Sequence, residues 1–146
     1  MEIKQMFESL ERILEKSKIA TLSTIRSNGY PSMRWMTPAL LRGQTGFLYA
    51  VSSSEFAWTQ SLAENPQVEW MIQTAPLQEI MHVNGRMQVI DNPALRADVQ
   101  EAIGGFLQTF WKNIPDESSL IVLETVIEGM TYFRPTVGEK VSVTIS

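Results

Sequence analysis

The stretch Lys18–Asn65 decides the fold. It contains KIATLSTI (18–25), SNG (27–29), YPSMRWMTP (30–38), GFLYAV (46–51) and SSSEFAWTQSLAEN (52–65). This order predicts a strand, a tight turn, two further strands and a helix. Asn28-Gly29 predicts a hairpin with a type I′ turn, because both central residues of that turn need a positive φ. Pro31 lacks a ladder donor, so it predicts an edge strand or a strand end.

Two features of this stretch indicate an anion-binding site. Arg34 is a permanent cation that stands among apolar neighbours on the second strand. The serine run 52–54 ends the third strand and opens the expected helix, with Ser53 or Ser54 as the N-cap. Free backbone N–H groups at such a place can hold a phosphate. From the residues alone, Arg34 either contacts a phosphate or pairs with a surface carboxylate.

Composition excludes several classes of function. The net charge is −4 and there is no basic block, which argues against nucleic acid as a partner. The chain has no cysteine and one histidine, His82, so a disulfide framework and a tetrahedral N/S metal site are both excluded. The N-terminus has no secretory signal, and no apolar run is long enough to span a bilayer. We expect one cytoplasmic domain over residues 1–146, with no metal and no membrane partner.

The remaining pattern predicts a mainly β (α+β) fold in which hairpins connect most strands. Gly85 predicts a bulge or a sharp bend, Asn92-Pro93 a capped helix start, and Glu128-Gly129 the turn of a final hairpin. Few long crossovers favour an antiparallel sheet closed into a small barrel. The expected helices cover 2–17, 54–64, 93–103 and 106–112, and the expected strands cover 18–25, 30–37, 47–51, 67–73, 77–90, 120–127 and 130–134.

The joint order of ATLST (20–24), NGYPSMRWM (28–36), FLYAVSS (47–53), LAENPQV (62–68) and TYFRP (131–135) resembles a known family. It is similar to the pyridoxamine 5′-phosphate oxidase-like proteins, and most of all to the small FMN-binding general stress proteins. This resemblance covers nearly the whole chain. It implies an antiparallel split β-barrel with flanking helices, a homodimer with FMN at the subunit interface, and an oxidoreductase of unknown substrate.

The resemblance also implies a set of cofactor-binding residues. Arg34 matches the arginine that contacts the FMN phosphate, and the backbone of Trp35 and Met36 matches the strand along the flavin ring. Trp111 stands where the family often places an aromatic residue from the other subunit. The implied cofactor-binding residues are Arg34, Trp35, Met36, Tyr49, Ala50, Val51, Ser52, Ser53, Trp58 and Trp111.

Two departures from the family pattern bear on function. Trp58 stands where the family has a lysine that neutralises the phosphate. FMN therefore either binds weakly, uses Ser53 or Ser54 instead, or is replaced by another ligand, and a further alternative is that Trp58 stacks on an aromatic ligand. The chain also ends without the R-x-H segment of true pyridoxamine phosphate oxidases, so we do not expect that activity. Two alternatives stay open: a non-catalytic flavin- or haem-binding protein, and a member with an empty pocket. His82 is either a haem ligand or a histidine with a structural hydrogen bond.

Overall fold

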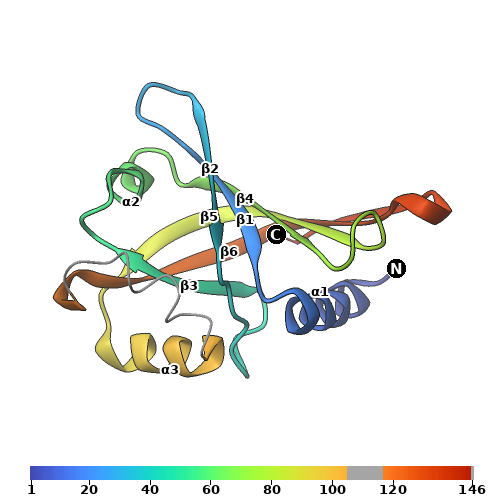
Figure 1. The fold of residues 1–146 in the computed structure, drawn as a ribbon, viewed down its shortest axis with the longest axis horizontal. Coiled ribbons are helices and arrows are strands. Elements are labelled where there is room, and N and C mark those ends of the chain that lie inside the picture. The colour runs from blue at the N-terminus through green and yellow to red at the C-terminus, as the bar shows by residue number, and fades with distance from the viewer. Residues whose placement is uncertain (105–116, 146) are drawn as a thin grey trace.

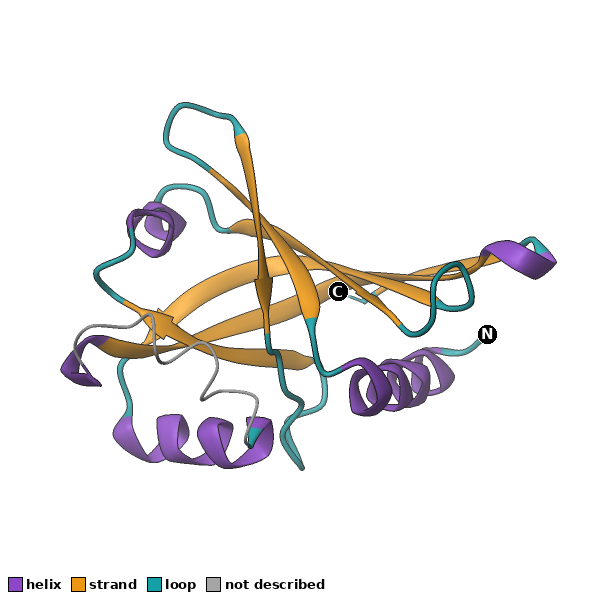
Figure 2. Ribbon diagram, in the orientation of Figure 1, coloured by secondary structure: helices purple, strands orange, loops and turns teal. Residues whose placement is uncertain are grey.

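The computed structural model describes residues 1–104 and 117–145. The expected helix 106–112, and Trp111 with it, lies outside the described residues. Seven antiparallel strands form one sheet in the order β2-β1-β4-β5-β6-β3, and β7 pairs with β6 (Figures 1 and 2). The strands are β1 (Ala20–Ile25), β2 (Pro31–Met36), β3 (Phe47–Ser53), β4 (Gln67–Gln73), β5 (Ile80–Ile90), β6 (Leu120–Arg134) and β7 (Glu139–Thr144).

The segment after β2 closes the sheet into a barrel. Ala39 donates its N–H to the carbonyl of Tyr49 on β3 at 2.7 Å, and Tyr49 donates back to Ala39 at 2.9 Å. One pair of bonds thus joins the two ends of the strand order, while β2 itself stays an edge strand, as Pro31 predicts. The antiparallel split β-barrel with flanking helices is therefore confirmed.

Helices α1 (Ile3–Ser17) and α3 (Pro93–Ile103) cover the barrel from outside (Figure 2). Both match their predicted bounds closely. Met6, Leu10, Ile13 and Leu14 of α1 are buried, and Asn92 caps α3 by accepting the N–H groups of Ala94 and Leu95. Trp70 is fully buried in the barrel core, where its indole N–H donates to Thr125 at 3.0 Å. Trp70 is therefore an anchor of the barrel core.

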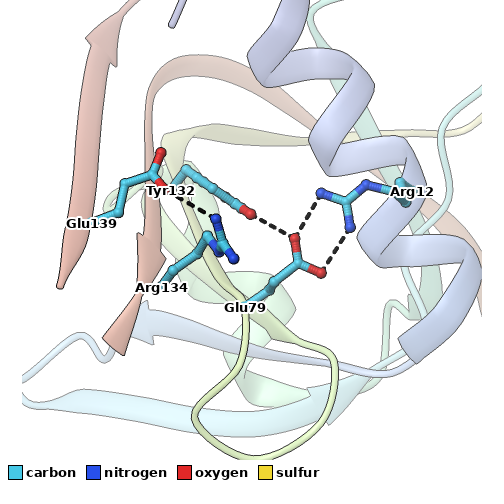
Figure 3. Close-up of polar contacts among 5 residues, drawn as sticks. All are labelled: Arg12, Glu79, Tyr132, Arg134 and Glu139. Carbon is cyan, nitrogen blue, oxygen red and sulfur yellow. Dashed lines mark hydrogen bonds and ion pairs between the residues drawn. The ribbon is translucent and has the colours of Figure 1, made fainter. Parts of the chain in front are cut away.

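One polar cluster fastens α1 to the sheet. Arg12 on α1 donates two hydrogen bonds of 2.7 Å to the Glu79 carboxylate, which lies in the loop before β5 (Figure 3). The Tyr132 hydroxyl on β6 donates to the same carboxylate at 2.6 Å. A bidentate arginine pair of this kind fixes geometry as well as adding energy. The cluster holds a helix, a loop and a strand in one arrangement.

The β1–β2 hairpin forms, but not through a type I′ turn. Gly29 has φ of 89°, and Asn28 is not among the residues with positive φ. The Gly29 N–H donates to the Arg26 carbonyl at 2.8 Å, and the Arg26 N–H donates to the Tyr30 carbonyl at 2.8 Å. This is the longer hairpin loop in which one glycine in the left-handed region follows an ordinary turn. The hairpin prediction is right, and its turn type is wrong.

The serine run does not cap a helix. Strand β3 continues to Ser53, and helix α2 (Ala57–Gln60) begins after Phe56 without a side-chain cap; a 3₁₀ turn, η1 (Ser61–Ala63), follows it. Ser53 is fully buried, its hydroxyl shares a 2.7 Å hydrogen bond with Ser119, and it accepts the Glu55 N–H at 3.1 Å. These bonds favour a turn over a helical cap. Helical structure therefore covers only 57–63 of the predicted helix 54–64, and the predicted start with Ser53 or Ser54 as its N-cap is wrong.

The C-terminal strands also differ from the prediction. Strand β6 continues through Glu128 and Gly129, so no turn forms there and the expected hairpin is wrong. The register shifts between Asn84 and Gly85 of β5, which leaves Glu128 unpaired as the extra residue of a β-bulge. The Gly85 bulge is therefore confirmed. The true final hairpin joins β6 to β7 through the short 3₁₀ turn η3 (Pro135–Val137), and β5 begins three residues later than predicted.

Candidate functional site

A cavity of about 750 Å³ opens between the β1–β2 hairpin, strand β2, the end of β3 and helix α2. This volume lies within the range of ~300–1,000 Å³ that is common for small-molecule sites. Its wall combines two arginines, one carboxylate, several hydroxyls and four large apolar or aromatic side chains. The lining residues are Arg26, Ser27, Asn28, Ser32, Arg34, Trp35, Met36, Thr37, Val51, Ser52, Glu55, Phe56, Ala57, Trp58 and Ser61.

Arg34 lies on the inner face of β2, because side chains alternate along a strand and Arg34 stands opposite Leu22 of β1. One terminal nitrogen of its guanidinium donates to the Leu22 carbonyl at 3.3 Å and to the Thr24 hydroxyl at 2.8 Å. The other donates to the Ser32 hydroxyl at 2.8 Å. These bonds hold the cation in one position at the cavity wall.

Trp58 of α2 contacts the other side of this cation. Its ring centroid lies 4.2 Å from the guanidinium carbon of Arg34, which is the geometry of a cation–π contact. Trp58, which stands where the resemblance implies a lysine, therefore shares the cavity with Arg34. It adds an aromatic face there and no charge.

The electrostatics of the cavity are those of an uncompensated cation. Burial, together with the neighbouring positive charge of Arg26, lowers the pKa of Arg34 to about 10. Arg34 stays protonated at neutral pH. Within residues 1–104 and 117–145, no carboxylate forms an ion pair with Arg34. The interpretation of Arg34 as a partner of a surface carboxylate therefore finds no support.

The structure brings six of the ten predicted site residues together and separates three others. The six that line the cavity are Arg34, Trp35, Met36, Val51, Ser52 and Trp58. Tyr49 instead packs against α3 and donates its hydroxyl to Glu124 at 2.9 Å. Ala50 lies in the barrel core, and Ser53 bonds Ser119. Only the end of β3 reaches the cavity, and Trp111 is outside the described residues.

Several cavity residues were missed by the sequence analysis. Ser32 could have been found, because period-two alternation puts it on the same face as Arg34. Arg26 lies on the hairpin turn, and Glu55 and Phe56 lie on the turn before α2, where no periodicity signals a direction. His82, by contrast, does not line the cavity. It lies half-exposed on β5, with Nδ1 4.0 Å from the Glu69 carboxylate.

The donor set fits a phosphorylated aromatic molecule. Arginine and hydroxyl donors gather at the hairpin side, which suits a phosphate, while Met36, Val51, Phe56 and Trp58 supply surface for a ring. Among the described residues, no three metal-binding side chains lie close enough together to hold an ion. No helix in the same part of the chain is long and apolar enough to cross a membrane.

Fold and cavity together define a class: split β-barrels with a ligand cavity beside an edge strand. The family model for pyridoxamine 5′-phosphate oxidase matches residues 6–132, and the chain belongs to that family. No curated protein matches the sequence.

Solved structures share the fold at low sequence identity. A Clostridium acetobutylicum protein related to general stress protein 26 of B. subtilis matches with a TM-score of 0.76 and 16% identity, over 99% of this chain and 97% of its own. A pyridoxamine 5′-phosphate oxidase-related, FMN-binding protein from Nostoc punctiforme matches with a TM-score of 0.69 and 14% identity, over 100% of both chains. A haem-binding protein from Mycobacterium smegmatis matches with a TM-score of 0.72 and 20% identity, over 95% of this chain and 57% of its own.

Proposed function

We propose that this protein binds FMN in the cavity, with the phosphate on Arg34. The observation that carries the proposal is the Arg34 guanidinium, a half-buried cation at the cavity wall that no carboxylate of the described residues neutralises. Burying a charge is costly unless a partner compensates it. A phosphate dianion supplies that compensation. The FMN-binding protein from Nostoc punctiforme, which shares the fold, supports the choice of FMN among phosphorylated aromatics.

The rest of the cavity suits the remainder of the cofactor. We place the ring beside the backbone of Trp35 and Met36 and the ribityl chain beside Val51 and Ser52 near the end of β3, because all four residues line the cavity. FMN would supply hydride and electron transfer, and the protein would bind it, orient it and exclude water. We propose an oxidoreductase of unknown substrate on this basis, with the cytoplasm as its compartment.

We further propose that two copies of the chain form a homodimer over this cavity. Three large apolar side chains are exposed on and beside the edge strand β2: Tyr30 by 67%, Met33 by 71% and Trp35 by 71%. Met33 and Trp35 share one face of β2 because side chains alternate along a strand, and exposed apolar surface of this kind is typical of an interaction site. Because Trp35 also lines the cavity, a second copy seated here would cover the ring.

The dimer has a direct test with a matched control. Trp35→Glu puts a charge in the proposed interface, so molar mass from light scattering should fall from dimer to monomer. Val137→Glu alters a residue that is similarly exposed, by 60%, on the turn between β6 and β7, and should leave the dimer intact. A wild-type protein that is monomeric at every concentration would contradict the proposal.

A visible spectrum tests the cofactor. The purified protein is mixed with excess FMN, desalted and scanned, and retained absorbance of bound flavin is the expected result. Loss of all flavin on desalting, together with no change on titration, would contradict FMN binding. Bleaching of bound flavin by NADH or NADPH and its return in air would favour an oxidoreductase over a non-catalytic flavin store.

Haem is the second candidate, because a haem-binding protein from Mycobacterium smegmatis shares the fold. The position of His82 weighs against it, since the single histidine lies away from the cavity and could not ligate iron there. Adding haemin in the same experiment separates the two, because flavin and haem spectra differ plainly. A protein that takes up neither would have an empty pocket.

A further inference from the structure

The β1–β2 hairpin brings a second arginine to the cavity. Arg26 is the first residue of the turn, and hydrogen bonds of 2.8 Å fix both its backbone N–H and its backbone carbonyl. Its neighbours Ser27 and Asn28 line the same wall. The turn therefore presents a cation and two polar side chains to the cavity from a backbone that is held in place.

Arg34 alone cannot satisfy a phosphate dianion. Both N–H groups of one terminal nitrogen are used by Leu22 and Thr24, and one N–H of the other is used by Ser32. Of the donors of a guanidinium, that leaves one terminal N–H and the Nε–H. A phosphate monoester offers three strongly accepting oxygens with up to two negative charges. It needs another donor group, and Trp58 carries none that can replace the lysine of the family.

The charged side chains of the cavity also favour a phosphate that lies between the two arginines. The positive charge of Arg26 acts on Arg34, so the two guanidinium groups repel each other across the cavity. Within the described ranges, Arg26, like Arg34, forms no ion pair, and Glu55 is the one acidic residue in the lining. The charged side chains of the cavity thus sum to +1. An anion between the two arginines would turn their repulsion into attraction for a shared partner.

We propose that Arg26 is the second cation for the phosphate of the ligand, and that it supplies from the hairpin turn the charge that is absent at Trp58. This inference rests on the proposed function in that it places the FMN phosphate in this cavity. It assigns to the hairpin the task of neutralising the phosphate, which a lysine on the helix has in the family pattern. Ser27 and Asn28 add neutral hydrogen-bonding groups to the same subsite.

Comparing FMN with riboflavin tests this assignment, because the two molecules differ only in the phosphate. Arg26→Gln should weaken FMN binding roughly tenfold or more, the scale of a lost charge-assisted bond, and leave riboflavin binding unchanged. Arg26→Lys should retain most of the affinity. Arg42→Gln is the matched control, since Arg42 is exposed on another turn and does not line this cavity. Unchanged FMN affinity in Arg26→Gln would overturn the proposal.

A smaller probe separates this inference from the proposed function. If FMN fails to bind the wild type, the proposed function falls, and phenyl phosphate, followed by tryptophan fluorescence, then decides on Arg26. Binding to the wild type that weakens in Arg26→Gln and not in Arg42→Gln supports the phosphate subsite. Equal binding to the wild type and Arg26→Gln, or binding to neither, overturns it.

Discussion

Replacing Glu79 with glutamine should destabilise the protein in a way that depends on pH. The Glu79 carboxylate accepts two hydrogen bonds from Arg12 and one from Tyr132 (Figure 3). The Arg12 hydrogen bonds are the main reason that the pKa of Glu79 falls from 4.5 to about 2, and Tyr132 contributes in the same direction against partial burial. A neutral amide keeps the shape of the side chain and loses its charge, so Glu79→Gln isolates the electrostatic part of the contribution that Glu79 makes to stability.

The magnitude follows from this shift. A difference of 4.5 − 2 = 2.5 pKa units corresponds to about 3.4 kcal/mol at about 1.36 kcal/mol per unit. That figure is an upper limit, because the Arg12 side chain is 43% exposed and solvent screens the pair. We expect a loss of about 1–2 kcal/mol at neutral pH.

The sign of the pH dependence follows from linkage. The folded pKa of Glu79 lies below the unfolded one, so its contribution is fully present above the unfolded value of 4.5 and is lost as pH falls toward 2. Urea unfolding of wild type and Glu79→Gln at pH 7 and pH 3 measures this. The difference in unfolding free energy between the two proteins at pH 3 should be less than half of the difference at pH 7.

A neighbouring ion pair supplies the control. Glu139 contacts Arg134 at 3.2 Å, and both side chains are about as exposed as Arg12, at 40% and 43% (Figure 3). Exposed pairs of this kind contribute ~0–1 kcal/mol, so Glu139→Gln should cost little at either pH. A loss of stability in Glu79→Gln that does not change with pH, or that is no larger than the loss in Glu139→Gln, would refute the reasoning.

Two further predictions concern the cavity. Glu55→Gln should tighten FMN binding by roughly two- to tenfold, because it removes the acidic residue of the lining, while Glu64→Gln, which is exposed and outside the cavity, should leave it unchanged. Equal affinities by calorimetry in wild type and Glu55→Gln would show that Glu55 does not act on the bound phosphate. Trp58→Lys should also tighten FMN binding, by roughly tenfold, because the new cation adds more than the lost stacking on Arg34 removes; no change would mean that position 58 lies out of reach of the phosphate.

Elements with their own local signals could be predicted from the sequence. Helix α3 begins at Pro93 directly after the capping Asn92, and β4 alternates strictly, so both were found with their exact bounds. The serine run was misinterpreted because Ser53 bonds Ser119, which is 66 residues away, and no local pattern reveals that contact. Glu128-Gly129 was taken for a turn because a bulge uses the same kind of residues.

The residues of the candidate site also divide into those with a signal in the sequence and those without one. Arg34 could be identified because it is a cation among apolar neighbours on a strand and because the family resemblance points to it, and Trp58 because it departs from the family pattern. Tyr49 and Ala50 were included because they belong to the right strand, although only the end of that strand reaches the cavity. Arg26 was missed because its place depends on how the hairpin lies over β3 and α2. That arrangement is a property of the closed barrel and not of the local sequence.

Calorimetric titration of wild type and Arg34→Gln with FMN and with riboflavin tests the central claim most directly. Arg34→Lys and a circular dichroism spectrum serve as controls for the fold, because Arg34 also bonds Leu22, Thr24 and Ser32. The account predicts that Arg34→Gln weakens FMN binding by roughly tenfold or more, with riboflavin affinity unchanged. A folded Arg34→Gln protein that binds FMN as tightly as the wild type would contradict it.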